Sequence, residues 1–409
     1  MKKSYLLLLF KCLLLMPLAQ AQDTPLLIYL DADRSHARES GIAIERGIRT
    51  ALDEINYTLA GHRIALKILD HRGNSRRSHL HLKQFIADPK ALAVFCGLHS
   101  PPLLANLQFI NENEILMLDP WAAAGPITRY QSDKPTVKNF VFRLSIDDSK
   151  AGTVLIHHAI KRNRHKQPHL LLEKTGWGRS NHRTMLTALQ QLDKPKSQVT
   201  WFDWGIRKTA AKIVLREIVQ TGADVIMLVA NAPEAKVFVK AMLELAPAQR
   251  LPIVSHWGLT GGDFPQVINA DMRSQLGLEF IQTSFSFLQM DNNPFAQQVF
   301  QHAQSLFPEL KTPADLKAAT GFIHAYDLTR LFIKAVEQTG LTGDKQKDKN
   351  AIRLALENLQ QPVQGLLKTY HQPFSTFSAN NPDAHEALGI NDFVLGHYGR
   401  WGEVILLPE

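Results

Sequence analysis

The sequence predicts an α/β protein made of two doubly wound lobes, each with a parallel central sheet. Short, continuously apolar runs alternate along the chain with stretches of helical period, which is typical of parallel sheets covered by helices on both faces. This alternation runs to about residue 142 and then starts again. The chain has 409 residues, and at about 150 residues per domain this length indicates two to three domains.

The first set of elements begins at Leu26. Apolar runs predict strands at 26–30, 64–69, 92–95 and 115–118. Between them lie helical stripes, the first of which ends near Asn56. The third helix opens at Ser100, which we expect to be its N-cap, with proline in the first turn.

The second set of elements follows the apolar stretch at 140–142. Strands are predicted at 170–172, 199–202, 225–229 and 252–254, again with helices between them. From about residue 295 helical patterns dominate, and the tail from 389 to 407 reads as extended strands. The polar stretch 342–349 is predicted to be a surface connection.

The first 21 residues have the pattern of a secretory signal peptide. A positive start at Lys2 and Lys3 precedes a short apolar run that ends at Ala19-Gln20-Ala21. We expect cleavage after Ala21, and an N-terminal membrane anchor is the alternative. Cleavage would leave Cys96 as the one cysteine, so no intramolecular disulfide could form. A soluble protein of the bacterial periplasm fits this pattern best.

Several functional classes lack their sequence signatures. The 46 basic and 38 acidic residues give a formal charge of +8, but the charges are scattered, so no nucleic-acid partner is predicted. Phosphate-binding, nucleophile-elbow and dinucleotide-binding motifs are absent from the sequence, so the prediction is a non-enzyme without a cofactor. His79 and His81 lie two apart on a predicted helix and would not share a face, so no metal site is predicted.

The loops after the predicted strands carry unusual residues. Ligands of open α/β sheets bind outside the carboxyl ends of the strands, so these loops are where a site is expected. Trp121, Trp177 and Trp257 each lie on such a loop. A tryptophan there can cover the core or form the wall of a ligand pocket. Three of them on the same expected edge favour the pocket.

Polar candidates surround the three tryptophans. Ser100 begins a helix, where free amides and the helix dipole can also hold an anion. Glu234 lies in a first helical turn, where it can compensate the dipole or contact a ligand ammonium. The full set of candidate ligand-binding residues is His99, Ser100, Trp121, Ala122, Ala123, Trp177, Arg179, Glu234, His256 and Trp257, with Arg34 as a further polar contact.

An ordered set of short motifs resembles one family. The chain is similar to the periplasmic solute-binding proteins of ABC transporters, in the branched-chain-amino-acid (leucine-binding-like) group with the type I periplasmic-binding fold. The resemblance covers nearly all of residues 25–340. It rests on the segments 41–56, Asp70, 97–100, Phe142-Arg143 with Asp147-Asp148, 176–180, 222–224 and 326–328.

The resemblance implies two lobes joined by a multi-strand hinge that close over a small ligand. We expect lobe 1 to comprise residues 22–142 plus about 272–345, and lobe 2 to comprise 143–271 plus about 346–409. In relatives that bind amino acids, the loop matching 97–100 supplies donors to the ligand carboxylate.

The loop matching 119–124 has a small-small-Thr pattern in the family, and here it contains Trp121, Ala122 and Ala123 without that threonine. The aromatic residue over the ligand maps to Thr175 or Trp177, and the acidic residue for the ammonium maps loosely to Glu234. These departures favour a flatter, aromatic or amide-like ligand.

Three functions remain open on the sequence. The first is a periplasmic receptor that delivers a small polar solute to a membrane ABC permease with separate ATPase subunits. The second is a ligand-sensing subunit for a membrane histidine kinase or cyclase. The third is a secreted enzyme on the same scaffold.

Overall fold

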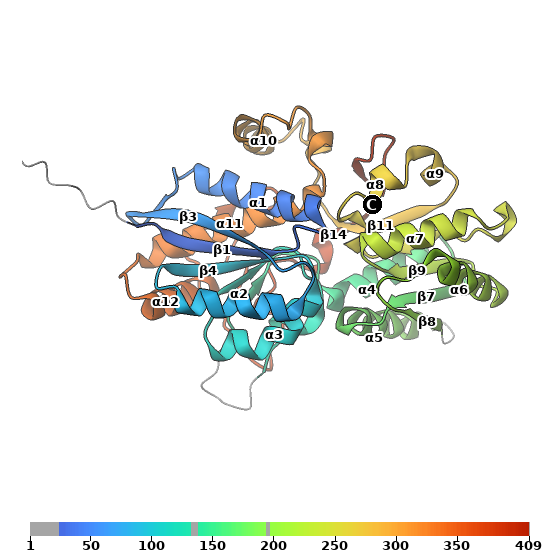
Figure 1. Ribbon diagram of the computed structural model, residues 1–409, viewed down its shortest axis with the longest axis horizontal. Coiled ribbons are helices and arrows are strands. Elements are labelled where there is room, and N and C mark those ends of the chain that lie inside the picture. The colour runs from blue at the N-terminus through green and yellow to red at the C-terminus, as the bar shows by residue number, and fades with distance from the viewer. Residues whose placement is uncertain (1–23, 132–137, 194–196, 409) are drawn as a thin grey trace, which may run out of the picture.

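Two α/β lobes, each built on its own sheet, lie side by side in the computed structural model (Figure 1). The structure describes residues 24–131, 138–193 and 197–408, so the predicted signal peptide lies outside the described residues. Most strand pairs in both sheets are parallel, and antiparallel pairs occur at sheet edges and near the C-terminus. The predicted fold class is therefore confirmed.

The first lobe has six strands in its described residues, in the order β2-β3-β1-β4-β5-β6. These strands are β1 (Leu26–Ala32), β2 (Thr58–Leu59), β3 (His62–Asp70), β4 (Ala91–Gly97), β5 (Met117–Asp119) and β6 (Val141–Arg143). Its helices are α1 (Arg38–Asp53), α2 (Ser75–Ala87), α3 (Ser100–Glu112), α10 (Pro294–Leu306), α11 (Ala319–Thr339) and α12 (Lys345–Glu357).

The sheet of the second lobe has seven strands among the described residues, in the order β15-β14-β11-β10-β9-β7-β8. They are β7 (Pro168–Glu173), β8 (Gln198–Phe202), β9 (Val225–Val229), β10 (Ile253–Ser255), β11 (Leu278–Thr283), β14 (Phe393–Tyr398) and β15 (Val404–Leu406). The helices are α4 (Asp148–His157), which continues into the π-helix η2 (His158–Arg162), α5 (Gly176–Gln191), α6 (Lys208–Gln220), α7 (Ala232–Leu243), α8 (Phe264–Val267) and α9 (Ala270–Ser274).

Shorter elements complete the chain. A two-stranded sheet pairs β12 (Val363–Gln364) with β13 (Thr369–Tyr370). Short 3-10 helices are η1 (Gly125–Thr128), η3 (Pro247–Gln249), η4 (Trp257–Thr260), η5 (Phe287–Gln289), η6 (Pro313–Asp315) and η7 (Ile390–Asp392). The strands predicted in the C-terminal tail are confirmed as β14 and β15.

The described chain passes between the lobes three times, after β6, after β11 and before β14. These passages lie together. The amide of Arg143 donates to the carbonyl of His385 at 2.9 Å, and the amide of Ser284 donates to the carbonyl of Asp392 at 2.9 Å. A three-segment connection of this kind is a natural hinge between two lobes.

The lobe boundaries differ from those predicted beyond residue 271. The segment 272–345 was expected in lobe 1, but its strand β11 pairs with β10 and β14 in the second sheet. The segment 346–409 was expected in lobe 2. It contains most of α12, however, and α12 packs against β4 and α11 of the first lobe. The number of crossings is the same as predicted, but the second falls after β11 and the third before β14, later in the chain than expected.

Close packing of α1 against α11 unites the first lobe across a long sequence separation. Gly47 lies at this contact, where an added Cβ would come within 2.3 Å of the carbonyl oxygen of Phe322. A residue with a side chain would therefore push the two helices apart. The core of the lobe forms around this contact, with Ile44, Ile48 and Tyr326 fully buried.

Two local predictions are corrected by the structure. The stretch 342–349 is not a surface connection throughout, because Asp344 caps α12 and both Asp348 and Lys349 are buried. Ser100 is the first residue of α3 rather than its N-cap, which is His99. The Ser100 hydroxyl instead accepts a hydrogen bond from the amide of Ala124 at 3.1 Å.

Candidate ligand-binding cleft

A pocket of about 270 Å³ opens where the two lobes meet. Its residues follow strands β1, β3 and β4 of the first sheet and β8 and β9 of the second. The pocket therefore lies at the carboxyl ends of both sheets, the edge at which open α/β sheets bind ligands. Its lining residues, which we call the outer pocket, are Asp33, His36, Arg72, Gly73, His99, Trp204, Asn231, Pro233 and Glu234.

On the first lobe, His99 is held by Asp33. The His99 Nε2 and the Asp33 Oδ2 lie 2.9 Å apart, and the Asp33 Oδ1 accepts the amides of Ser35 and His36. Burial opposes ionisation of Asp33, but these hydrogen bonds outweigh it and hold the pKa of its carboxyl below the usual range. The His99 Nδ1 is buried without a partner, so it is available to a molecule in the pocket.

On the second lobe, the carboxyl groups of Glu173 and Glu234 lie close together near Trp204. The Trp204 ring meets the His99 ring edge-on across the junction, with centroids 6.0 Å apart. Glu234 accepts the amide of Gly205 at 3.1 Å. Burial raises the pKa of Glu173 to about 7, and the charge of Glu234 adds to this shift. The pocket thus offers an exposed indole beside acceptor groups.

Beneath the outer pocket lies a group of buried residues, several of them aromatic, which we call the cleft floor. Its members are Ser100, Trp121, Ala122, Ala123, Trp177, His256 and Trp257. Trp121 follows β5 of the first lobe and Trp257 follows β10 of the second. Their rings stack with centroids 4.5 Å apart and an angle of 21° between planes. One ring from each lobe therefore closes the floor.

Several polar atoms of this region have no hydrogen-bond partner. The His256 Nε2 and the Asp148 Oδ1 lie 2.9 Å apart, an ion-pair distance, but neither atom is aligned for a hydrogen bond. The Trp177 Nε1 and the Asn181 Oδ1 are likewise buried without partners. Burial raises the pKa of Asp148 above its ordinary value. Buried polar groups are almost always paired in folded proteins, so unpaired ones indicate a place for a ligand or water.

A buried arginine fixes the loop that carries Trp121. The Arg143 guanidinium donates to the carbonyls of Ala122 at 3.0 Å and Ala124 at 2.9 Å. The same group forms a two-pronged pair with Glu386, at 2.9 and 2.6 Å, and lies 2.9 Å from Asp147. The cleft floor is thereby attached to the segments that pass between the lobes.

The structure brings most of the predicted residues to the cleft, but not all. His99 and Glu234 line the outer pocket, and the seven residues of the cleft floor were also among those predicted. Arg179 is exposed on α5 and lines no part of the outer pocket. Arg34 is paired with Glu45.

The prediction missed Trp204, Asn231 and Glu173. Trp204 stands two residues after β8, so the strand-end rule would have found it if applied to that strand. Asn231 lies in the loop after β9, the same strand-end loop that leads to the predicted residue Glu234. Glu173 is the last residue of β7, and its burial beside a second carboxylate is a tertiary feature without a local sequence signal.

Within the described ranges, no group of three or more histidine, cysteine, aspartate or glutamate side chains is arranged to hold a metal ion. No helix in the part of the chain that the structure describes is both long and apolar enough to cross a membrane. Cys96 is buried, and its thiol donates to the Asp119 Oδ1 at 3.2 Å.

Two α/β lobes, a three-segment connection and a pocket at the carboxyl ends of both sheets define the class of two-lobed binding proteins. A family model described as periplasmic binding protein matches residues 29–384. The chain therefore belongs to the periplasmic binding protein family.

Solved structures show the same fold at low sequence identity. A periplasmic binding protein type 1 from Bordetella pertussis Tohama I has a TM-score of 0.76 and 15% identity, covering 94% of this chain and all (100%) of that one. The leucine-binding protein LivK from Thermotoga maritima has a TM-score of 0.71 and 18% identity, covering 94% and 98%. A solute-binding protein of an ABC transporter from R. palustris, in complex with benzoate, has a TM-score of 0.72 and 17% identity, covering 94% and 96%. No curated protein sequence matches the chain.

Proposed function

We propose that the chain is a periplasmic solute-binding protein that captures a small polar organic solute between its lobes and delivers it to an ABC permease. The observation that carries this proposal is the outer pocket, whose walls come from the carboxyl ends of both sheets. A solute there would touch both lobes at once, so it would bind the closed arrangement better than an open one. This coupling is what a capture-and-release receptor requires.

The ligand class follows from the side chains around the pocket. Trp204 offers an aromatic face, and Glu234 and Asp33 offer acceptors beside the partner-free Nδ1 of His99. Such a set suits a planar or aromatic body that carries a hydrogen-bonding or cationic group. We therefore propose an amino acid, amide or aromatic-acid type of solute. The similarity to the LivK protein and to the benzoate-bound protein agrees with this range.

The cleft floor would take part once the lobes separate. Trp121, Trp177 and Trp257 would enclose the ligand body, while Ser100 and nearby amides would anchor a carbonyl or carboxylate group. The proposed polar contacts from the second lobe are Glu234 and His256. Arg179 is left out of this site because its side chain is exposed on α5.

A thermal-shift screen of residues 22–409 tests the proposal directly. The panel contains amino acids, amides, aromatic acids, purines and polyamines. A solute that binds only the folded protein raises the melting temperature, and the rise grows with the logarithm of the ratio of its concentration to its dissociation constant. We expect one chemical class to do so and to be recovered unchanged afterwards. Consumption of the solute would instead support an enzyme, and no response to any class would count against the proposal.

Replacement of Trp204 locates the binding site. Trp204→Ala should weaken binding of the solute by about 2 kcal/mol, because a stacked aromatic contact and its buried area are lost. Trp204 is 45% exposed, so the melting temperature of the free protein should change little. Trp401→Ala is the matched control, since Trp401 is 74% exposed and does not line the outer pocket. Equal affinities of the two variants, measured by titration calorimetry, would place the solute elsewhere.

A further inference from the structure

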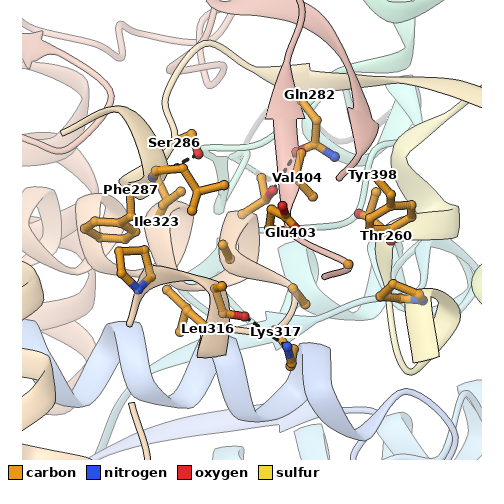
Figure 2. Close-up of a pocket in the computed structure, with 18 of the residues that line it drawn as sticks. Thr260, Gln282, Ser286, Phe287, Leu316, Lys317, Ile323, Tyr398, Glu403 and Val404 are labelled. Atoms are coloured by element: carbon orange, nitrogen blue, oxygen red, sulfur yellow. Dashed lines mark hydrogen bonds between the residues drawn. The ribbon is translucent and has the colours of Figure 1, made fainter. Parts of the chain in front are cut away.

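A second pocket lies at the lobe junction, away from the outer pocket and formed by different residues (Figure 2). Its first-lobe wall is the stretch from Leu316 to Thr320 at the start of α11, and its second-lobe wall includes Gln282 of β11 and Tyr398 of β14. The enclosed space is about 40 Å³, enough for a few atoms the size of water.

The amide of Gln282 presents its nitrogen as an unpaired donor. The Thr320 hydroxyl donates to the Gln282 oxygen at 2.6 Å, a separation typical of O–H···O bonds and short for a nitrogen. The oxygen therefore faces Thr320, and the Nε2 points toward the side of the pocket where Tyr398 lies (Figure 2). Gln282 is 2% exposed, and its Nε2 has no partner. A buried amide left in this state costs free energy unless something accepts from it.

Tyr398 supplies a second unpaired donor on the same wall. Its side chain is 9% exposed, and its hydroxyl has no partner. Burial raises the pKa of this hydroxyl well above its ordinary value, so it keeps its proton and remains a donor.

The opposite wall is the N-terminus of a long helix. Helix α11 has 21 residues, and no side chain caps its first turn. Free amides and the helix dipole at such an end favour negative charge. Lys317, whose Nζ donates to the carbonyl of Ala314 at 2.9 Å, adds a cation at this wall. Glu403 is the opposing charge that lines the pocket, and its carboxylate accepts the amide of Trp401 at 2.7 Å.

We propose that this pocket is a second binding site, specific for a small carboxylate, distinct from the solute site in the cleft. One carboxylate can accept from Gln282, Tyr398 and the start of α11 together, because it offers two oxygens and about four lone-pair sites. Its donors come from both lobes, so the bound carboxylate joins them. Binding there favours the arrangement in which the two walls are close, and by linkage it strengthens any solute that prefers the same arrangement.

Sodium acetate is the probe that tests the site. We expect acetate to raise the melting temperature of residues 22–409 with the logarithmic dependence on concentration of a ligand that binds only the folded state, whereas sodium chloride at matched ionic strength does not. Gln282→Glu keeps the acceptor for Thr320 and replaces the donor by a negative oxygen, so the dissociation constant for acetate should rise tenfold or more. Gln301→Glu, at an exposed position of α10, is the matched control for added charge and should bind acetate normally.

Two further variants keep the test decisive. If Gln282→Glu folds poorly, Tyr398→Phe removes only the hydroxyl and should weaken acetate in the same direction. Trp204→Ala should leave acetate binding unchanged, because Trp204 does not line this pocket. The proposal is overturned if acetate has no effect beyond chloride, if Tyr398→Phe binds it normally, or if Trp204→Ala abolishes it. Loss of acetate binding in Trp204→Ala would place acetate in the outer pocket instead, whereas the other two results leave the solute site untouched.

Discussion

The lobe connection and the cleft floor both contain buried polar side chains, but these are paired in the connection and partly unpaired at the cleft floor. In the lobe connection, the Arg143 guanidinium is in direct contact with the carboxylates of Glu386 and Asp147. At the cleft floor, His256 faces Asp148 without an aligned hydrogen bond, and the Trp177 Nε1 has no partner.

Two carboxyl groups make the contrast measurable. Burial opposes ionisation of Asp147, but Arg143, Arg129 and Lys150 hold its pKa far below the usual range. Burial dominates at Glu173, next to the cleft: hydrogen bonds with Trp204 and Thr175 do not offset it, and the pKa is raised to about 7. The buried charges of the connection compensate one another, whereas the cleft holds polar groups that a ligand can satisfy.

The largest effect is expected in the connection. Arg143→Met leaves Glu386 and Asp147 buried without their cation, so the free energy of unfolding should fall by about 3–5 kcal/mol. Urea unfolding followed by circular dichroism measures this change. Adding Glu386→Met to the same protein should restore part of the loss. A loss below about 1 kcal/mol, the size typical of exposed ion pairs, would contradict the comparison.

A pH-dependent effect of intermediate size is expected at Glu173. Because its folded-state pKa is about 7, above the ordinary value of 4.5, the folded protein binds more protons than the unfolded chain between these values. Stability from this residue is therefore fully present below pH 4.5 and is lost as the pH rises through 7. The loss is roughly 3 kcal/mol, since each pKa unit is worth about 1.4 kcal/mol.

The variant Glu173→Gln should remove this part of the pH dependence. The difference in unfolding free energy between wild type and variant, measured from pH 4 to pH 8.5, isolates Glu173 from other titrating groups. A difference that does not change with pH would show that Glu173 has an ordinary pKa.

The smallest effect is expected at Ser100. Ser100→Ala leaves the amide of Ala124 without its acceptor and should cost about 1 kcal/mol of unfolding free energy. Ser305→Ala is the control, because Ser305 is exposed and only donates to a carbonyl in its own helix. If the two variants lose the same stability, the Ser100 hydroxyl does not hold the floor loop.

The fold could be predicted because its strands carry a local signal. The runs at β4 and β9 are apolar throughout, as is the centre of β7 at 170–172, since both faces of these strands are covered. The lobe membership of β11 and α12 could not be predicted in the same way. Which sheet a strand joins depends on contacts far along the chain, and the local pattern of β11 is the same in either sheet.

The candidate site shows the same limit at the level of side chains. The strand-end rule located His99 and Glu234 in the outer pocket. It failed for Arg179, which lies two residues after Trp177 on α5, where residues two apart do not share a helix face. The pairing of Asp33 with His99 joins residues 66 positions apart and required the structure.

The stacked indoles of Trp121 and Trp257 give the protein an internal optical gauge. One ring belongs to each lobe, their centroids are 4.5 Å apart, and both side chains are buried. Separation of the lobes, which exchange of a solute in this cleft would require, would part the rings and wet them. Tryptophan emission and near-ultraviolet circular dichroism should therefore follow opening and closing without any attached label. The variant Trp257→Phe should lose most of the change in both signals.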